Sequence, residues 1–306
     1  MKYVLIYGDV LIDQFSTRVE NNQCEKFLGG ATVNVAVGVR RLGVPTNFVT
    51  VFGEQEDSTF AKTRLLEEGV DITYSQTVPH KMLSNVYVNL LPNGDRIFNR
   101  YEDSTPTIQV TKEAFQPSVF HEASIFHFSS GTMFQQNALE TTMHAVTVSN
   151  KNGLIVSFDA NIRPLRWENE EICRETITSF LPFVDVLKVT EEELYFLTKT
   201  NNRAMGVRKL APYQLPLIFV TAGEKGTYAI FHGITYYVPA EKVKVIDTTG
   251  AGDAFMASIL SSIYKEGIPE DESSLIKYTK LGNKIGALAT TKRGAITALP
   301  KDTILK

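Results

Sequence analysis

The stretch DTTGAGDAF, residues 247–255, carries the strongest structural signal in the chain. Apolar residues then recur at helical spacing as far as Gly267, so a helix is predicted to begin at Gly250-Ala251-Gly252. The first N–H groups of a helix have no partner within it, and the helix dipole makes that end positive. Small residues leave these donors uncovered, which predicts a binding site for an anion such as a phosphate.

Asp253 stands in the first turn of this predicted helix. Its charge would repel a bound phosphate, unless the carboxylate serves to remove a proton from a hydroxyl group that attacks the phosphorus. The simpler interpretation is an acidic residue that complements the helix dipole. Asp253 taken alone favours the simpler interpretation, whereas its nine-residue context favours a general base.

Upstream of this helix, short apolar runs alternate with helical patterns. The alternation predicts an α/β protein with a mostly parallel central sheet covered by helices on both faces. The predicted helices are Ala31–Leu42, which ends before Gly43, and Ser58–Glu68, which follows Asp57 as the expected N-cap and ends before Gly69. The predicted strands are Tyr3–Tyr7, Phe48–Phe52, Ser124–Phe128, Leu154–Phe158, Val184–Val189 and Leu217–Thr221.

Two stretches depart from this alternation. Residues 14–27 and 85–101, the second with a turn at Pro92-Asn93-Gly94-Asp95, have the pattern of antiparallel strands. They indicate either a small β lid that projects from the main sheet or an ordinary hairpin at its edge. No linker divides the chain, so we expect one domain over residues 1–306 with this excursion.

The composition and charge of the chain limit the kinds of partner that it is expected to bind. The 306 residues are 43% hydrophobic and 21% charged, and the formal net charge of −3 provides no field that would attract a nucleic acid or a membrane. The two cysteines, Cys24 and Cys173, lack the spacing of a disulfide framework or a zinc site. The first apolar stretch is too short for a signal peptide, and no run approaches a membrane span, so we expect a cytoplasmic protein.

Other glycine-rich motifs do not fit the spacing. A dinucleotide fingerprint requires a third glycine where Phe255 stands, which disfavours a redox enzyme with a Rossmann site. Gly223-Glu224-Lys225-Gly226 is too short for a Walker A loop, and neither HExxH nor GxSxG occurs.

Residues 247–260 resemble the C-terminal signature of the ribokinase-like, or PfkB, carbohydrate kinases, whose DTxGAGD core is intact here. Residues 29–36, GGATVNVA, followed by Gly43 and Gly53, are similar to the N-terminal signature. Ser258 stands where the family usually has Gly or Ala, and Thr32 replaces a frequent Pro. The resemblance covers essentially the whole chain and implies a ribokinase-like three-layer α/β fold with a small β lid.

The resemblance also implies catalytic roles. Asp253 would be the base for a sugar hydroxyl, and Gly250, Ala251 and Gly252 would form the anion hole that stabilises the transferred phosphoryl group. Fixed backbone donors suit this reaction, because phosphoryl transfer depends mainly on positioning and charge stabilisation.

Sugar binding is implied for the N-terminal half of the chain. Asp13, Gly29, Gly30 and Asn34 match family positions that hold sugar hydroxyls, and a carboxylate that accepts from vicinal hydroxyls rejects analogues lacking them. Without the signature, these residues would be read as a solvated aspartate, a turn and a helix-face amide.

ATP and Mg²⁺ are the cofactors that the family implies. Lys188-Val189-Thr190-Glu191 resembles the Asn-x-x-Glu element, so Glu191 is the expected magnesium residue, with a solvated acidic helix start as the alternative. Many relatives also hold K⁺ through carbonyl groups of the loop before the anion hole. The residues implied in nucleotide binding are Lys188, Thr221, Gly223, Gly226 and Asn283.

The motif D-x-N-x-R-x-x-x-W at residues 159–167 bears on which molecule accepts the phosphoryl group. It stands at the predicted carboxyl end of a strand, where α/β sheets bind ligands. This element resembles one shared by fructokinases, 2-keto-3-deoxygluconate kinases and some aminoimidazole riboside kinases, and it implies roles for Asn161 and Arg163 at the substrate. Arg100 on the predicted lid matches an arginine of the same subgroup. The sequence GGA at 29–31 favours fructose, while the other two acceptors remain open.

A non-catalytic sugar or nucleotide sensor on the same fold is a further alternative, disfavoured because the base and the anion-hole glycines are all present. If the outer lid strands have exposed edges, their pairing would produce a homodimer.

Overall fold

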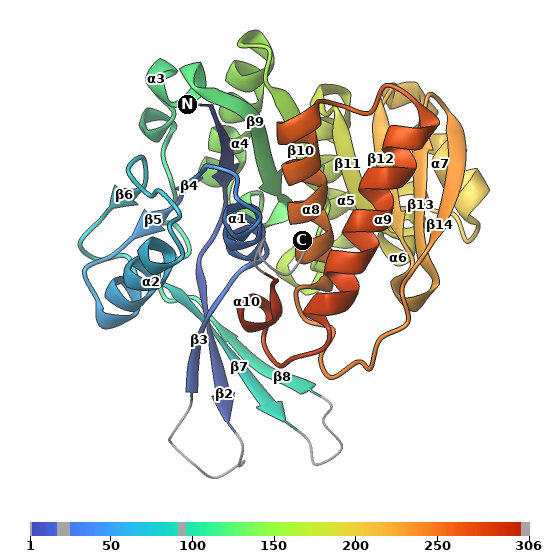
Figure 1. The fold of residues 1–306 in the computed structure, drawn as a ribbon. Coiled ribbons are helices and arrows are strands. Elements are labelled where there is room, and N and C mark those ends of the chain that lie inside the picture. The colour runs from blue at the N-terminus through green and yellow to red at the C-terminus, as the bar shows by residue number, and fades with distance from the viewer. Residues whose placement is uncertain (1, 17–24, 91–95, 301–306) are drawn as a thin grey trace.

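The computed structural model describes residues 2–16, 25–90 and 96–300. An eight-stranded sheet forms the centre of the molecule and lies between two layers of helices (Figure 1). Its strands, in spatial order, are β14 (Ile234–Pro239), β13 (Gly226–Phe231), β12 (Leu217–Thr221), β11 (Val186–Thr190), β10 (Ile155–Asp159), β9 (Ala123–Ser129), β1 (Tyr3–Tyr7) and β4 (Thr46–Val49).

The pairings from β4 across to β12 are parallel, and β13 and β14 complete the sheet in antiparallel pairs. Strands covered on both faces read as continuous apolar runs rather than as alternating patterns. Each predicted strand overlaps an observed one, although the run 48–52 is divided between β4 and the short strand β5 (Val51–Phe52). The predicted α/β fold class is therefore confirmed.

Helices cover both faces of the sheet, and each layer packs on its own apolar cluster. One layer holds α1 (Ala31–Arg41), α8 (Ala251–Glu266) and α9 (Glu272–Ala289), and the other holds α4 (Gln136–Lys151), α5 (Glu170–Phe180), α6 (Glu191–Thr198) and α7 (Arg203–Leu210) (Figure 1). The remaining elements are α2 (Glu56–Glu67), α3 (Pro117–His121), α10 (Ala295–Ala298) and β6 (Gln76–Thr77), which pairs with β5.

A second, four-stranded sheet projects from the body and is called the lid sheet below (Figure 1). The strands of the lid sheet, in order, are β3 (Glu25–Gly29), β2 (Leu11–Ser16), β7 (Ser84–Leu90) and β8 (Arg96–Glu102). The expected antiparallel arrangement holds within each hairpin, but β2 and β7 pair in parallel and join the two hairpins. The predicted turn at Pro92–Asp95 and Cys24 lie outside the described residues.

Asp57 has a different role from the one its position predicts. The N-cap of α2 is Gln55, and the Asp57 carboxylate accepts hydrogen bonds from Lys26 Nζ at 2.8 Å and Asn85 Nδ2 at 3.4 Å. Since Lys26 and Asn85 belong to the lid sheet, Asp57 attaches that sheet to α2. The expectation of an N-cap is corrected by these long-range partners.

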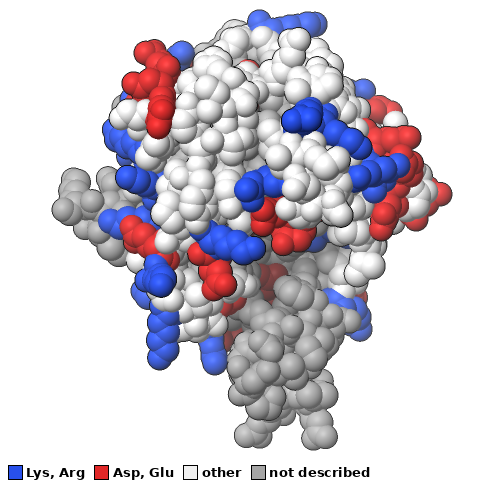
Figure 2. Space-filling model, turned by 90° about the vertical axis from the view of Figure 1, so that its right-hand side faces the viewer, with Lys and Arg blue, Asp and Glu red and all other residues white. Residues whose placement is uncertain are grey.

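Charged groups of both signs are interspersed on the face shown in Figure 2, in line with the formal net charge of −3. No helix within the described ranges has the length and apolar character needed to cross a membrane.

Candidate active site

The functional residues collect where the parallel strands end. Asp159 is the last residue of β10, and Lys188 lies on the adjacent strand β11, directly opposite it in the register. β1 runs in the same direction and leads into the lid sheet. Ligands bind at the carboxyl ends of the strands in open sheets of this kind, so the topology places a site beneath the lid sheet.

Asp253 lies in the first turn of α8 and is 8% exposed. Its Oδ2 accepts a hydrogen bond of 2.7 Å from Nδ2 of Asn34 on α1, across 219 residues of sequence. The structure thus brings the residue predicted as base into contact with one predicted to bind sugar. The Oδ1 of Asn34 is buried and has no partner among the described residues, so it remains available as an acceptor.

The environment of Asp253 makes it a stronger base than an ordinary aspartate. Burial, and next to it the neighbouring charge of Asp159, raise its pKa to about 6. The hydrogen bond from Asn34 and the positive charges of Lys188 and Arg163 oppose this rise. A carboxylate with this pKa is mostly ionised at neutral pH and still accepts a proton readily.

Glycines shape the start of α8. Gly250 has φ of 75°, and a Cβ there would lie 2.6 Å from the Cβ of Ala295. A Cβ on Gly252 would lie 3.0 Å from Lys188 Nζ. Ala251 N–H donates to the carbonyl of Thr248 at 3.3 Å, whereas the next N–H groups stand at a helix start that offers no intrahelical partner. The lysine ammonium and these donors point to one positive binding site.

Lys188 is buried, and its Nζ donates to both carboxylate oxygens of Asp159 at 3.0 and 3.1 Å. The negative charge of Asp159 keeps this lysine protonated although burial opposes its charge. The pair fixes a cation beside Gly252 at the start of α8.

Glu191, the predicted magnesium residue, pairs with an arginine and not with Lys188. Its Oε1 accepts from Arg203 Nη1 at 2.9 Å, and the Arg203 guanidinium lies over the ring of Tyr228. Of the glutamates at the start of α6, Glu193 is the one whose charge acts on Lys188. Its carboxylate accepts from the N–H groups of Ile162 and Thr190, both at 2.8 Å.

Among the residues predicted to bind sugar, Asp13 lies on β2, opposite Phe27 of β3 in the register. A Cβ on Gly29 would come within 2.7 Å of the Asp13 carboxylate, so the glycine allows this side chain to pack against the backbone. Gly30, with φ of 113°, is the N-cap of α1 and approaches the carbonyl of Asp9. The glycine pair therefore joins the lid sheet to the helix that carries Asn34.

The loop after β10 carries the next two predicted residues. Asn161 adopts a left-handed conformation with φ of 39°, and its carbonyl accepts from Ser130 Oγ at 3.0 Å. Arg163 is exposed, and its charge acts on Asp253. Arg100 is not brought to this group, because it stacks on Tyr87 and pairs with Glu102 at 2.8 Å on β8.

The predicted nucleotide residues lie around the β12–β13 turn. Thr221 ends β12, and Gly223 and Gly226 both have positive φ. Asn283 on α9 is already engaged, since its amide accepts from Thr227 Oγ1 at 2.6 Å and donates to the carbonyl of Val238 at 2.9 Å. Asn283 therefore holds the β13–β14 hairpin to α9.

The loop before α8 is fixed by Asp247. Its carboxylate accepts from the N–H groups of Thr249 at 3.0 Å and Gly294 at 2.8 Å. These bonds hold the carbonyl groups that the family resemblance associates with K⁺.

Two site residues were not singled out from the sequence. In the sequence, Asp159 was noted only as the first residue of the D-x-N-x-R-x-x-x-W motif. Glu193 had a usable signal, because Thr190-x-x-Glu193 is a capping box, and both of its reciprocal hydrogen bonds form at the start of α6.

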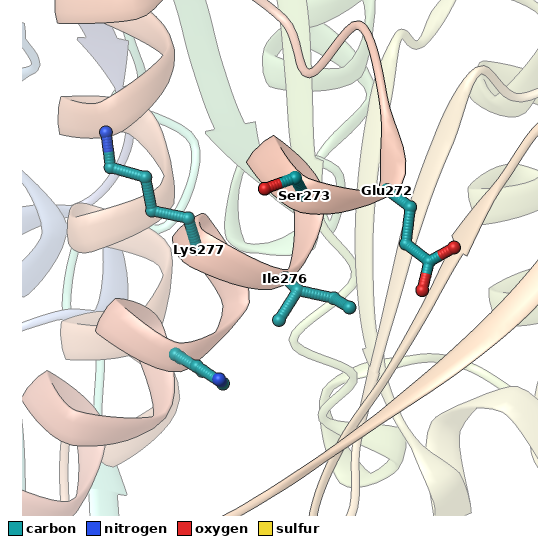
Figure 3. A pocket seen from close by; sticks show the side chains of 5 residues that line it. Glu272, Ser273, Ile276 and Lys277 are labelled. Atoms are coloured by element: carbon teal, nitrogen blue, oxygen red, sulfur yellow. The ribbon is translucent and has the colours of Figure 1, made fainter.

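A surface hollow on α9 lies apart from this group (Figure 3). It is lined by Glu272, Ser273, Ile276, Lys277 and Lys280, all from one helix. None of them is a residue of the strand-end cluster, so the hollow does not compete with it as the functional site.

Comparison with known proteins shows the family to which the chain belongs. The model of the pfkB family carbohydrate kinases matches residues 1–302. A fructokinase of Klebsiella pneumoniae is 35% identical over 273 residues, which cover 89% of this chain and 88% of that protein.

Two solved structures have the same fold. The fructokinase of Vibrio cholerae O395, with fructose, ADP and calcium bound, superimposes with a TM-score of 0.87 at 30% identity, covering 100% of this chain and 98% of that one. The aminoimidazole riboside kinase of Salmonella enterica, with its riboside and an ATP analogue, gives 0.86 at 27% identity, covering 99% and 98%. The class defined by the fold and the site is that of sugar phosphotransferases. The chain belongs to the pfkB family of carbohydrate kinases.

Proposed function

We propose that this protein is a fructokinase that transfers the γ-phosphoryl group of ATP to a primary hydroxyl of fructose. The observation that carries the proposal is the buried Asp253 carboxylate at the start of α8, bonded to Asn34 and next to the Lys188 cation. The similarity to several fructokinases supports fructose as the acceptor.

The reaction follows from these groups. Asp253 accepts the proton of the acceptor hydroxyl, whose oxygen forms a bond to the γ-phosphorus as the bond to the ADP oxygen breaks. The N–H groups at the start of α8 stabilise charge on the phosphoryl oxygens without reorganising. Lys188 supports them as a fixed cation, held in place by Asp159.

Asp13, Asn34 and the glycine pair Gly29-Gly30 would hold the sugar hydroxyls from the lid side. Asn161 and Arg163 would close the site from the loop after β10, and Arg100 would require a rearrangement of its contacts with Tyr87 and Glu102. The nucleotide would lie along Thr221, Gly223 and Gly226, with Asn283 supporting the hairpin.

A magnesium ion fits the charge balance of the site. Asp159, Glu193 and Asp253 place three carboxylates around one lysine, and this surplus of negative charge suits a divalent cation. No cluster of three ligating side chains occurs in the described parts of the chain, which favours an ion held by phosphate oxygens and water. Glu193 would orient that water, since Glu191 is paired with Arg203. When bound, Mg²⁺ would neutralise part of the negative charge on the phosphate groups of ATP.

The loop carbonyls around Asp247 and Thr249 are the place where K⁺ would act if the enzyme is activated by a monovalent cation. Aminoimidazole riboside is the second candidate acceptor, because the riboside kinase of Salmonella enterica has nearly the same fold. 2-Keto-3-deoxygluconate is a third, since residues 159–167 do not separate these acceptors.

ADP release measured over a panel of fructose, other hexoses, ribosides and 2-keto-3-deoxygluconate tests the acceptor. We expect the highest kcat/KM with fructose. Absence of fructose turnover together with strong turnover of another acceptor would reject the fructose assignment while leaving the kinase intact.

Asp253→Asn tests the base. We expect loss of at least about a hundredfold in kcat, because general base catalysis contributes about that much, with fructose binding by calorimetry largely retained. Asp271→Asn is the matched control, since Asp271 caps α9 far from the site and asparagine is an equally good cap. Turnover at the wild-type rate in Asp253→Asn would disprove the assignment.

A further inference from the structure

The base of the lid sheet contains a group of charges that has no place in the reaction described above. Arg166 is its centre, at the end of a short 3₁₀ turn (Pro164–Arg166) in the loop after β10. Its guanidinium lies 4.3 Å from the ring centroid of Tyr101 on β8 and 4.1 Å from that of Phe134, which follows β9. A flat guanidinium can contact two rings at once, so one side chain joins the lid sheet to the body.

The charges around Arg166 are balanced. Arg166 Nη2 lies 4.0 Å from Asp103 Oδ2, and their side chains are 25% and 11% exposed. Lys81 is buried, and Asp9, just past β1, feels the charges of Arg166, Lys81 and Asp103. Two cations thus face two carboxylates at the lid base. Because removal of one partner from a buried set leaves another unpaired, the arrangement is sensitive to geometry.

Arg166 is also tied to the substrate loop. Its N–H donates to the carbonyl of Arg163 at 2.9 Å, which closes the turn that begins at Arg163. The next residue, Trp167, meets the ring of Phe134 edge-on, with centroids 5.1 Å apart. The ring of Phe134 therefore holds the end of this loop through two consecutive side chains.

We propose that Arg166 is a positioning residue for the acceptor sugar. By joining β8 of the lid sheet to the loop that carries Asn161 and Arg163, it holds the two walls of the sugar site at a fixed separation. Two other lid strands, β3 and β7, are attached to the body separately, through Lys26 and Asn85 to Asp57. The inference rests on the proposed function only in that the acceptor binds between these walls.

Arg166→Met tests the proposal, because it keeps an unbranched side chain and removes the flat cation. We expect the KM for the acceptor to rise about tenfold, with the KM for ATP changing less than about twofold, because the nucleotide residues lie on other strands. Arg166→Lys keeps the charge facing Asp103 and loses the double stacking, so we expect an intermediate KM. Asp103→Asn, which alters the cluster without changing its shape, provides a second variant if Arg166→Met folds poorly, and it should also raise the KM for the acceptor.

Arg174→Met is the matched control. Arg174 also lies over a ring, Phe196 at 4.6 Å, and pairs with Glu170 and Glu171, but it belongs to α5. It should lower the thermal unfolding temperature without changing the KM for the acceptor. The kinetics use whichever acceptor the wild-type enzyme phosphorylates fastest, so rejection of fructose does not affect this test. An acceptor KM within about twofold of wild type in both Arg166→Met and Asp103→Asn would overturn the proposal, as would an equal rise in the KM values for ATP and acceptor.

Discussion

At the scale of single residues, the proposed base Asp253 lies at the same helix start as the proposed anion site. Its carboxylate is separated from water, faces Asp159, and is restrained by one hydrogen bond from Asn34. Burial makes it basic, while the nearby cations keep it ionised.

This balance predicts the pH profile. Asp253 acts as a base only when ionised, so kcat/KM for the acceptor should be flat above its pKa of about 6 and fall tenfold per unit below it. Asn34→Ala removes a donor that lowers this pKa, so the acidic limb should move to higher pH.

The measurement is kcat/KM for the acceptor as a function of pH in wild type and Asn34→Ala. Asn150→Ala serves as the control, because Asn150 bonds the carbonyl of Phe183 just before β11 begins, at the opposite end of the parallel strands, and should leave the profile unchanged. A limb that stays in place or moves to lower pH in Asn34→Ala would refute the role of this hydrogen bond.

The positions of residues within the two signatures could be predicted from the sequence, because those positions depend on local backbone geometry. The glycines at 250 and 252 stand at a helix start whether or not the rest of the fold is known. Arg166 was missed because its side-chain partners Tyr101, Phe134 and Asp103 are distant in sequence, whereas Glu193 was missed although its capping box gave a local signal. Which of three consecutive glutamates faces Lys188 depends on how α6 leaves β11, and the spacing alone did not determine that orientation.

At the scale of elements, α8 is shaped by the glycines at its two ends. Gly250 at the N-cap and Gly267 at the C-cap both have positive φ, but only Gly250 has a close neighbour, Ala295. Substituting alanine at each end therefore distinguishes the cost of backbone strain, which both positions share, from the cost of a steric clash, which only Gly250 has.

Gly267→Ala should reduce the free energy of unfolding by about 1–3 kcal/mol, because its φ of 89° and ψ of 178° lie in a region that is essentially confined to glycine. Gly250→Ala should cost about 1–3 kcal/mol more, because the new Cβ also meets Ala295, and it should lower kcat by shifting the anion hole. Urea unfolding and steady-state kinetics of both variants provide the measurement. Equal destabilisation of the two would contradict the contact with Ala295.

Elements with continuous apolar runs were predicted well, since burial on both faces of a parallel sheet leaves a clear signature. Tyr3–Tyr7 and Leu217–Thr221 have the predicted bounds. The cap of α2 was predicted wrongly, because Asp57 finds Lys26 of the lid sheet as a partner, and nothing near it in the sequence indicates that contact.

At the scale of the whole molecule, the edges of the lid sheet bear on how two chains could assemble. The lid sheet ends in β3 on one side and β8 on the other, and no further strand of the described residues pairs with either. An exposed strand edge tends to acquire a partner, and a second copy of the same chain is the simplest one.

We therefore expect a homodimer through the lid sheets. Light scattering during size-exclusion chromatography should give twice the mass of one chain at micromolar concentration, and cross-linking should join lid residues of two subunits. A single-chain mass over the whole concentration range used in kinetics would rule out this assembly.

The contact between Asn34 and Asp253 has a consequence for biosynthesis. A growing chain completes β1, the first lid hairpin and α1 long before α8 leaves the ribosome. Until then α1 lacks the helix against which Gly38 packs at Ala257, and the apolar side of α1 has only the sheet for cover. A truncated product that ends before α8 would carry the residues proposed to bind sugar without the proposed base, so we expect it to lack kinase activity. Catalytic competence and cover for α1 would thus arise in the same step, when α8 is synthesised.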